Sequence, residues 1–164
     1  MSNEHRGEVS NKLLNVPYFK QEKGTTCGPA CLRMATAFEG GNYSEGRLEE
    51  ACKTGWLGNT CEELAEGAKE IGFESEVLEN ITKEDLKRLL EAKQPVIALT
   101  APWILYGGLP GFGHFVVIIG LENGKIYYHD PDMKENLTKE IDLFFSAWEK
   151  YSFKGVKLCK STKK

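Results

Sequence analysis

Residues 26–38 read TCGPACLRMATAF, and this stretch predicts where the first helix and the chemistry begin. Proline is tolerated in the first turn of a helix because its missing N–H would have no partner there, so Pro29 fits a helix that starts near Cys27. Gly40 and Gly41 are typical of residues that end such a helix. Cys27 therefore stands at a helix N-terminus, where unpaired amides and the helix dipole favour its thiolate.

The rest of the chain is divided by capping residues, turns and apolar runs. Thr60 and Glu63 have the spacing of a capping box, and Thr82 with Asp85 predicts a second capped helix. We expect further helices over 45–53, 60–72, 82–93 and 139–151, and strands over 73–78, 95–100, 115–121, 125–130 and 154–159. Helices first and an antiparallel sheet later predict an α+β fold. Residues 1–13 are expected to form a flexible arm, and 14–164 a single domain.

Composition excludes several classes of protein. The chain has 164 residues and a net charge of −3, and its 41% hydrophobic and 27% charged residues argue against a disordered chain. Before the lysine-rich C-terminus there is no long basic run, so a nucleic-acid partner is not expected. The N-terminus has no apolar signal region, and five cysteines cannot all pair with one another, so we expect reduced thiols and a cytoplasmic protein.

The uncharged stretch from Pro95 to Leu121 has the length of a membrane span. It also contains Pro102, Gly107 and Gly108, together with other helix breakers, and no intact helix can run through that set. We therefore expect two buried strands joined by an apolar loop, and no integral membrane segment.

A cysteine nucleophile needs a base, and the chain offers only His5, His114 and His129. His114 follows a glycine-rich loop and begins an apolar strand, a position that is held rigidly yet open to a substrate. His129 adjoins Asp130, but neighbouring side chains on a strand point to opposite faces, so these two do not form a dyad.

The hairpin at residues 122–124 decides whether His114 and Asp130 share a face. A two-residue turn would pair Val117 with Asp130 and place the two side chains on opposite faces. A three-residue loop would pair Val116 with Asp130 and place them on the same face. We expect the three-residue loop, with a positive φ at Gly124, while Pro131 takes the chain out of the ladder.

The cysteines also allow a purely structural interpretation, since most free cysteines are small buried hydrophobes. Cys31, Cys52, Cys61 and Cys159 are expected to be packing residues. Their spacings do not form a standard pair of zinc knuckles, so neither a metal nor another cofactor is expected. For acyl chemistry, the Cys27 amide and the side-chain amide of Gln21 can supply an oxyanion hole.

Four short motifs in order carry a resemblance to a known family: Val16-Pro17-Tyr18-Phe19-Lys20-Gln21, Cys27-Gly28-Pro29-Ala30-Cys31-Leu32, Gly113-His114-Phe115-Val116-Val117-Ile118 and Asp130-Pro131. This pattern, over roughly residues 14–160, resembles the C39 (bacteriocin-processing) cysteine peptidases, a papain-like family. The resemblance implies a papain-like α+β fold, with an N-terminal helical half packed on a C-terminal antiparallel sheet. It also implies Cys27 as nucleophile, His114 as base and acid, Asp130 as the residue that orients His114, and Gln21 as oxyanion donor.

The best-known members of that family are N-terminal domains of export transporters that cut leader peptides after two glycines. This chain resembles the stand-alone relatives instead, so the resemblance implies a peptide or protein substrate without naming the bond, and allows association with a separate exporter. The apolar loop over 101–113 is expected to wall the substrate cleft through Trp103, Tyr106 and Gly113, unless it is simply a buried loop. Two other functions remain open: an acyltransferase using the same Cys27, and a non-catalytic peptide-binding module.

Overall fold

The computed structural model describes residues 13–161, so the expected arm lies outside the described residues except for Leu13. The helices are α2 (Cys27–Phe38), α3 (Glu45–Ala51), α4 (Cys61–Glu70), α5 (Lys83–Glu91), α6 (Pro102–Tyr106) and α7 (Ile141–Glu149). The strands are β1 (Phe73–Leu78), β2 (Val96–Thr100), β3 (His114–Glu122), β4 (Lys125–His129), β5 (Leu137–Glu140) and β6 (Gly155–Lys160).

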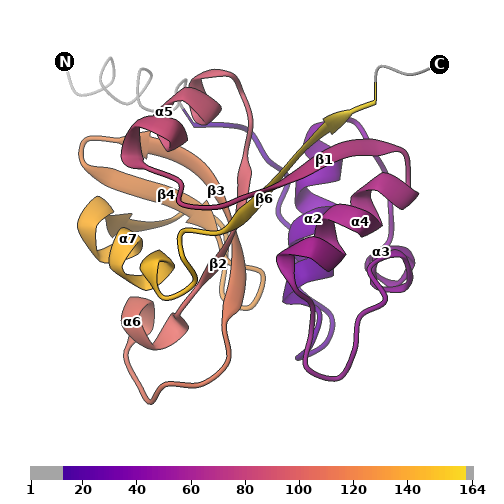
Figure 1. Ribbon diagram of the computed structural model, residues 1–164, viewed down its shortest axis with the longest axis horizontal. Coiled ribbons are helices and arrows are strands. Elements are labelled where there is room, and N and C mark those ends of the chain that lie inside the picture. Colours follow the sequence, from indigo (N-terminus) through magenta and orange to yellow (C-terminus); the bar gives the residue numbers. More distant parts are fainter. Residues whose placement is uncertain (1–12, 162–164) are drawn as a thin grey trace.

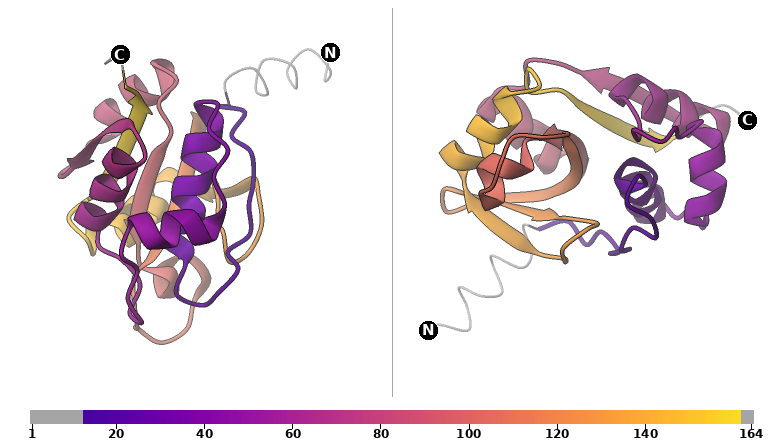
Figure 2. Two further views of the ribbon diagram at one scale, coloured as in Figure 1. Left: turned by 90° about the vertical axis from the view of Figure 1, so that its right-hand side faces the viewer. Right: turned by 90° about the horizontal axis from the view of Figure 1, so that it is seen from below.

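A six-stranded sheet in the order β1-β6-β2-β3-β4-β5 runs through the middle of the molecule, and all of its strand pairs are antiparallel (Figure 1). Helices α2, α3 and α4 lie on one side of the strands, whereas α6 and α7 lie on the other, as the view from below shows (Figure 2, right). The α+β architecture predicted from the sequence is confirmed, with the N-terminal helical half packed on the sheet.

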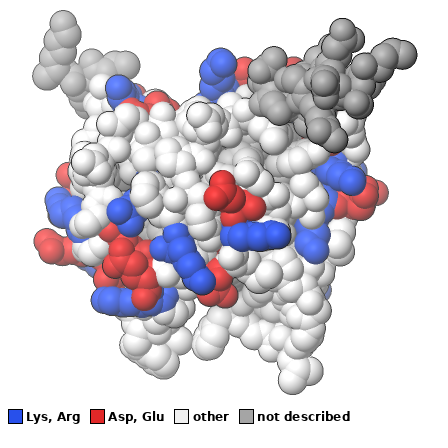
Figure 3. Space-filling model, turned by 180° about the vertical axis from the view of Figure 1, so that it is seen from behind, with Lys and Arg blue, Asp and Glu red and all other residues white. Residues whose placement is uncertain are grey.

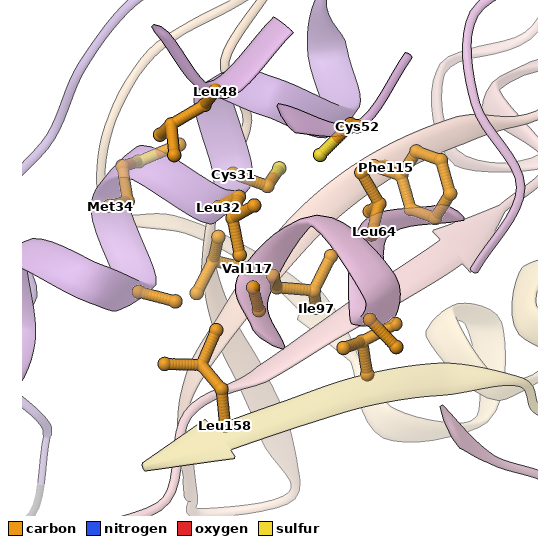
Figure 4. Close-up of a cluster of buried hydrophobic side chains, with 14 of the residues drawn as sticks. Cys31, Leu32, Met34, Leu48, Cys52, Leu64, Ile97, Phe115, Val117 and Leu158 are labelled. Carbon is orange, nitrogen blue, oxygen red and sulfur yellow. The ribbon is translucent and has the colours of Figure 1, made fainter. Parts of the chain in front are cut away.

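The two faces of the sheet bury two separate cores. Ile97, Phe115 and Val117 point toward α2 and α4, where they meet Leu32 and Leu64 (Figure 4). The alternate strand residues point the other way and pack under α5, α6 and α7; they include Val96, Ala98, Val116, Ile118 and Tyr128. Because side chains alternate along a strand, each apolar run of the sheet supplies both cores.

Local capping signals determine several helix ends as predicted. Thr60 accepts from the Glu63 amide while the Glu63 carboxylate accepts from the Thr60 amide. Thr82 and Asp85 form the same reciprocal pair at the start of α5. These are complete capping boxes, so both helices begin where the sequence pattern places them.

Two elements differ from the expectation. The helix predicted over 139–151 begins only at Ile141, because residues 137–140 pair with β4 as the edge strand β5. The stretch expected as an apolar loop over 101–113 contains the short helix α6, with Pro102 in its first turn and a C-cap at Gly107, whose φ is 86°. Pairing with the preceding strand, β4, overrides the local helical pattern in the first case.

The β3–β4 hairpin reaches the expected register by another route. Glu122 pairs with Lys125 across a two-residue turn, so the prediction of a three-residue loop was wrong. Asn123 and Gly124 both have positive φ, 55° and 73°, which suits the tight turn that an Asn-Gly pair favours and confirms the prediction for Gly124. The extra residue instead sits inside β3: Ile119 lies in a register shift between Ile118 and Gly120.

This bulge has a consequence for the chemistry. Val117 faces His129, so the next position along, Val116, is opposite Asp130, as the three-residue loop would have required. Asp130 itself lies beyond the end of β4, since its amide donates to the Lys134 carbonyl in a turn.

Candidate active site

Cys27 begins α2, and the segment before it is folded tightly. The side chain of the buried Thr26 does not cap the helix; it accepts from the Lys23 amide and donates to the Lys23 carbonyl, both at 3.0 Å. The first-turn amides of α2 have no partners within the helix, so the end that carries Cys27 can stabilise negative charge. The thiol is half-buried, whereas Cys31, one turn further on, is fully buried in the first core.

His114 opens β3 and contacts the carboxylate of Asp130. Its Nε2 atom lies 2.6 Å from Oδ1 of Asp130. The Asp130 side chain is fully buried, and two further donors hold it: the Tyr106 hydroxyl at 2.6 Å from Oδ2 and the Asp132 amide at 2.9 Å from Oδ1. Burial raises the pKa of this carboxyl, but the hydrogen bonds from His114 and Tyr106, with the charge on His114, outweigh it and lower the pKa below its usual value.

The His114 ring links Asp130 to Cys27. Burial lowers the pKa of His114, yet hydrogen bonds to Asp130 and to Cys27, together with the charges on both, raise it to about 10. Because Nε2 is engaged with Asp130, Nδ1 is the ring nitrogen left to serve Cys27. Cys27 at the start of α2, His114 at the start of β3 and Asp130 just after β4 thus lie together.

Gln21 is anchored beside the site by hydrogen bonds from both its backbone and its side chain. Its amide N–H donates to the Pro131 carbonyl at 2.8 Å, which ties it to the residue after Asp130. Its side-chain Nε2 donates to the Lys23 carbonyl at 2.9 Å and keeps a second hydrogen, while Oε1 is buried without a partner.

Glu45 and Tyr18 also support the site, although no sequence motif indicates a role for either. The buried carboxylate of Glu45, at the start of α3, accepts the Glu22 amide at 3.1 and 3.0 Å. Burial raises the pKa of Glu45. Tyr18 donates its hydroxyl to the backbone carbonyl of Asp130 at 2.8 Å. No local pattern distinguishes such residues, because each partner is distant in the sequence.

His129 points away from the site, as strand alternation predicts. Its Nε2 lies 2.8 Å from the Val16 carbonyl, and its Nδ1 accepts the Asn136 amide at 3.1 Å. The first contact needs a proton on Nε2 and the second needs an unprotonated Nδ1, so the ring is neutral in this arrangement. Burial lowers its pKa accordingly.

Trp103, Tyr106 and Gly113, the three residues expected to line the substrate cleft, differ from one another in their surroundings. Trp103 packs partly against the second core from α6, and the hydroxyl of Tyr106 faces Asp130. Gly113 is close-packed: a Cβ there would lie 2.8 Å from the Tyr151 ring and 3.0 Å from Leu99. The exposed apolar side chains of this region are Leu109 and Phe112, which are 90% and 75% exposed.

No three or more His, Cys, Asp or Glu side chains within residues 13–161 are grouped so that they could hold a metal ion. The five cysteines, all within that part of the chain, are free. Nor does any helix between Leu13 and Ser161 combine the length and apolar character needed to cross a bilayer.

Comparison with known proteins decides the family. The model of the Peptidase_C39 like family matches residues 13–156. This chain belongs to that family. Across 74% of its length, the C39 like chain is 32% identical to the transport/processing ATP-binding protein ComA of Streptococcus pneumoniae. It spans only 16% of the length of that relative.

Solved structures agree with this assignment. The peptidase domain of Streptococcus ComA matches with a TM-score of 0.71 and 26% identity, over 87% of this chain and 97% of that one. A C39-like peptidase of Bacillus anthracis matches with a TM-score of 0.76 and 18% identity, over 92% and 98%. A double glycine motif protease from an AMS/PCAT transporter, solved with a leader peptide, gives 0.67 and 19%, over 92% and 94%. The C39 like chain is a cysteine peptidase with the papain-like fold of these domains.

Proposed function

We propose that this chain, as a single peptidase domain from residue 14 to 164, hydrolyses a peptide bond through Cys27, His114, Asp130 and Gln21. The observation that carries the proposal is the 2.6 Å contact between His114 and the buried Asp130. Cys27, at the start of α2, is close enough to raise the pKa of the same ring. A buried carboxylate on one ring nitrogen and a thiol on the other is the arrangement that a cysteine nucleophile needs.

The reaction then proceeds through an acyl-enzyme. The Cys27 thiolate attacks the carbonyl carbon, and the oxygen takes up negative charge beside the Cys27 amide and the free hydrogen on Gln21 Nε2. The C–N bond breaks as His114 donates its proton to the leaving amine, and a thioester remains on Cys27. His114 next removes a proton from water, which attacks the thioester and releases the acid and the thiolate.

The apolar loops beside the site suit a peptide substrate with apolar residues. The α6–β3 loop carries Leu109 and Phe112, and the α3–α4 loop carries Trp56, 83% exposed, and Leu57. Both loops extend from the lower end of the molecule (Figure 1), and from behind this end shows no charged side chains (Figure 3). Gly58 approaches the backbone just before Cys27, at Thr25, and the other loop leads into His114, so the two tips flank the nucleophile and the base.

The decisive experiment is a cleavage assay with leader peptides and a general peptide library, read by mass spectrometry. Wild-type protein should produce new termini, and Cys27→Ala should not. Cys31→Ala, a buried neighbour on the same helix, is the matched control and should retain cleavage. Retained cleavage by Cys27→Ala would contradict the assignment. Products cut after Gly-Gly would indicate leader processing within a partnership with an exporter, and other products a different substrate.

Two other outcomes separate the alternative functions. Adding amines or thiols to the assay tests acyl transfer, since a transferase and a hydrolase share the thioester and differ in the second nucleophile. A stable complex of wild-type protein with uncut peptide, and no thioester, would favour a binding module.

A further inference from the structure

Both ends of the α6–β3 loop are held by one carboxylate. Tyr106 is the last residue of α6 and His114 is the first residue of β3. The Tyr106 hydroxyl lies 2.6 Å from Oδ2 of Asp130, and His114 Nε2 lies 2.6 Å from Oδ1. The loop between them, residues 107–113, is therefore closed at its base by the two oxygens of a single buried side chain.

The number of hydroxyl hydrogens fixes which tyrosine donates in each hydrogen bond. A phenol hydroxyl has one hydrogen, and Tyr106 donates it to Asp130. The Tyr128 hydroxyl, 2.9 Å from that of Tyr106, must then be the donor in their contact. Burial, followed by the hydrogen bond to Asp130, raises the pKa of Tyr106. Burial raises the pKa of Tyr128 to about 12, so both hydroxyls keep their hydrogens at neutral pH.

We propose that Tyr106 is a positioning residue for the site: it fixes the Asp130 carboxylate, and through it the ring of His114. Asp130 is fully buried, so without the Tyr106 hydroxyl its Oδ2 would lose its donor, and the carboxylate would turn to recover one. Since the His114 ring is hydrogen-bonded to Oδ1 of Asp130, the ring would turn as well. Small displacements of a reacting group can cost up to about 100-fold in rate.

The same contact couples the loop to the base. Gly107 and Gly108 follow Tyr106 directly, with φ of 86° and 106°, and a Cβ at either would meet nothing within 4 Å. The loop is therefore loosely packed just after Tyr106, between two ends that Asp130 holds. Because its ends converge on Asp130, the conformation of the loop and the orientation of His114 are linked through Tyr106.

The test compares Tyr106→Phe with Tyr128→Phe in the full chain. Each variant removes one hydroxyl of the same hydrogen-bonded chain, but only the first removes a donor from Asp130. This inference rests on the proposed function for its kinetic part, so a readout independent of activity is measured first. That readout is the downfield NMR signal of the His114 Nε2 proton in the free protein.

We expect Tyr106→Phe to shift or broaden that signal and to lower kcat by about 10-fold or more, with KM changed less than about twofold. Tyr128→Phe should leave both within about twofold of wild type, while urea unfolding records the stability of each. Equal effects of the two variants, or an unchanged His114 signal in Tyr106→Phe, would overturn the proposal.

A double-mutant cycle with Asp130→Asn separates positioning from general stability. If Tyr106 acts through Asp130, adding Tyr106→Phe to Asp130→Asn should change kcat/KM by less than about twofold. Additive losses would mean that Tyr106 acts elsewhere. Cleavage that survives Cys27→Ala would refute the proposed function alone, since the NMR result on the free protein would still decide the role of Tyr106.

Discussion

His114 and Asp130 meet across the β3–β4 hairpin because a bulge at Ile119 corrects the register that the two-residue turn sets. Without the extra residue, alternation along the strands would place the two side chains on opposite faces of the sheet. With it, a buried carboxylate faces Nε2 and leaves Nδ1 for Cys27.

Replacing Asp130 with Asn should abolish most activity. The amide removes the charge that supports an imidazolium and presents the wrong partner to Nε2, so we expect kcat to fall roughly 10²–10⁴-fold. Steady-state cleavage assays measure the loss. His129→Gln, on the next residue but on the other face, is the control and should retain kcat; equal losses would contradict the assignment.

The reactivity of the cysteines should differ with pH. Cys27 and Cys159 are the two that are not fully buried, which makes Cys159 an internal reference. Burial, with the nearby Glu74 charge, raises the pKa of Cys159, so it should alkylate slowly at neutral pH. Cys27, at the start of α2 and near His114, should alkylate much faster than Cys159 at neutral pH, and His114→Ala should suppress this. Peptide mass spectrometry reads each site; similar rates at both cysteines would argue against an activated Cys27.

The stability contributed by His114 should decline in alkaline solution. Its folded pKa of about 10 lies above the model value of 6.5, so the protonated ring stabilises the fold fully below pH 6.5. That contribution is lost as the pH rises toward 10. Urea unfolding should therefore show the gap between wild type and His114→Gln narrowing over this range. A gap that widens would contradict the sign of the shift.

His129 should show the opposite dependence. Burial lowers its folded pKa, so its contribution is fully present above pH 6.5 and is lost as the pH falls through the folded value. Below pH 6.5 we expect wild type to lose stability faster than His129→Gln, which can still donate to the Val16 carbonyl. Parallel unfolding curves for the two proteins would disprove this.

Gln21→Ala should lower kcat by about 10²–10³-fold, as the loss of one oxyanion donor does. Alkylation of Cys27 forms no oxyanion, so its rate should remain close to that of wild type. A change confined to KM would instead assign Gln21 to substrate binding.

Gly113→Ala should destabilise the fold by about 1–3 kcal/mol, the usual cost of overpacking, because the new methyl group would collide with Tyr151 and Leu99. His114 is the next residue, so activity should fall as well. Gly111→Ala is the matched control, since a Cβ there meets nothing within 4 Å. Thermal melting curves and kcat distinguish the two variants.

Phe112→Ser should raise KM with little effect on kcat or stability if the loop tip contacts substrate, because 75% of that side chain is exposed and packs little. Leu143→Ser, on the exposed side of α7, is the control and should leave KM unchanged. An unchanged KM in Phe112→Ser would remove this loop tip from the substrate-binding surface.

The sequence alone determined what depends on near neighbours. The capping boxes at Thr60 and Thr82, the start of α2 at Cys27 and the alternation that separates His129 from the site all follow from contacts within a few residues. The short motifs around Cys27, His114 and Asp130 also pointed to the family, because the chemistry requires those residue types and a shared fold keeps them in the same order along the chain.

Only the tertiary structure decided what depends on distant partners. Residues 137–140 form a strand rather than the first turn of a helix because β4 offers an unpaired edge. The bulge at Ile119 and the contact of Tyr106 with Asp130 likewise arise between segments brought together by packing of the two cores. Such contacts leave no periodic pattern in the chain, since their energy depends on which surfaces meet after folding.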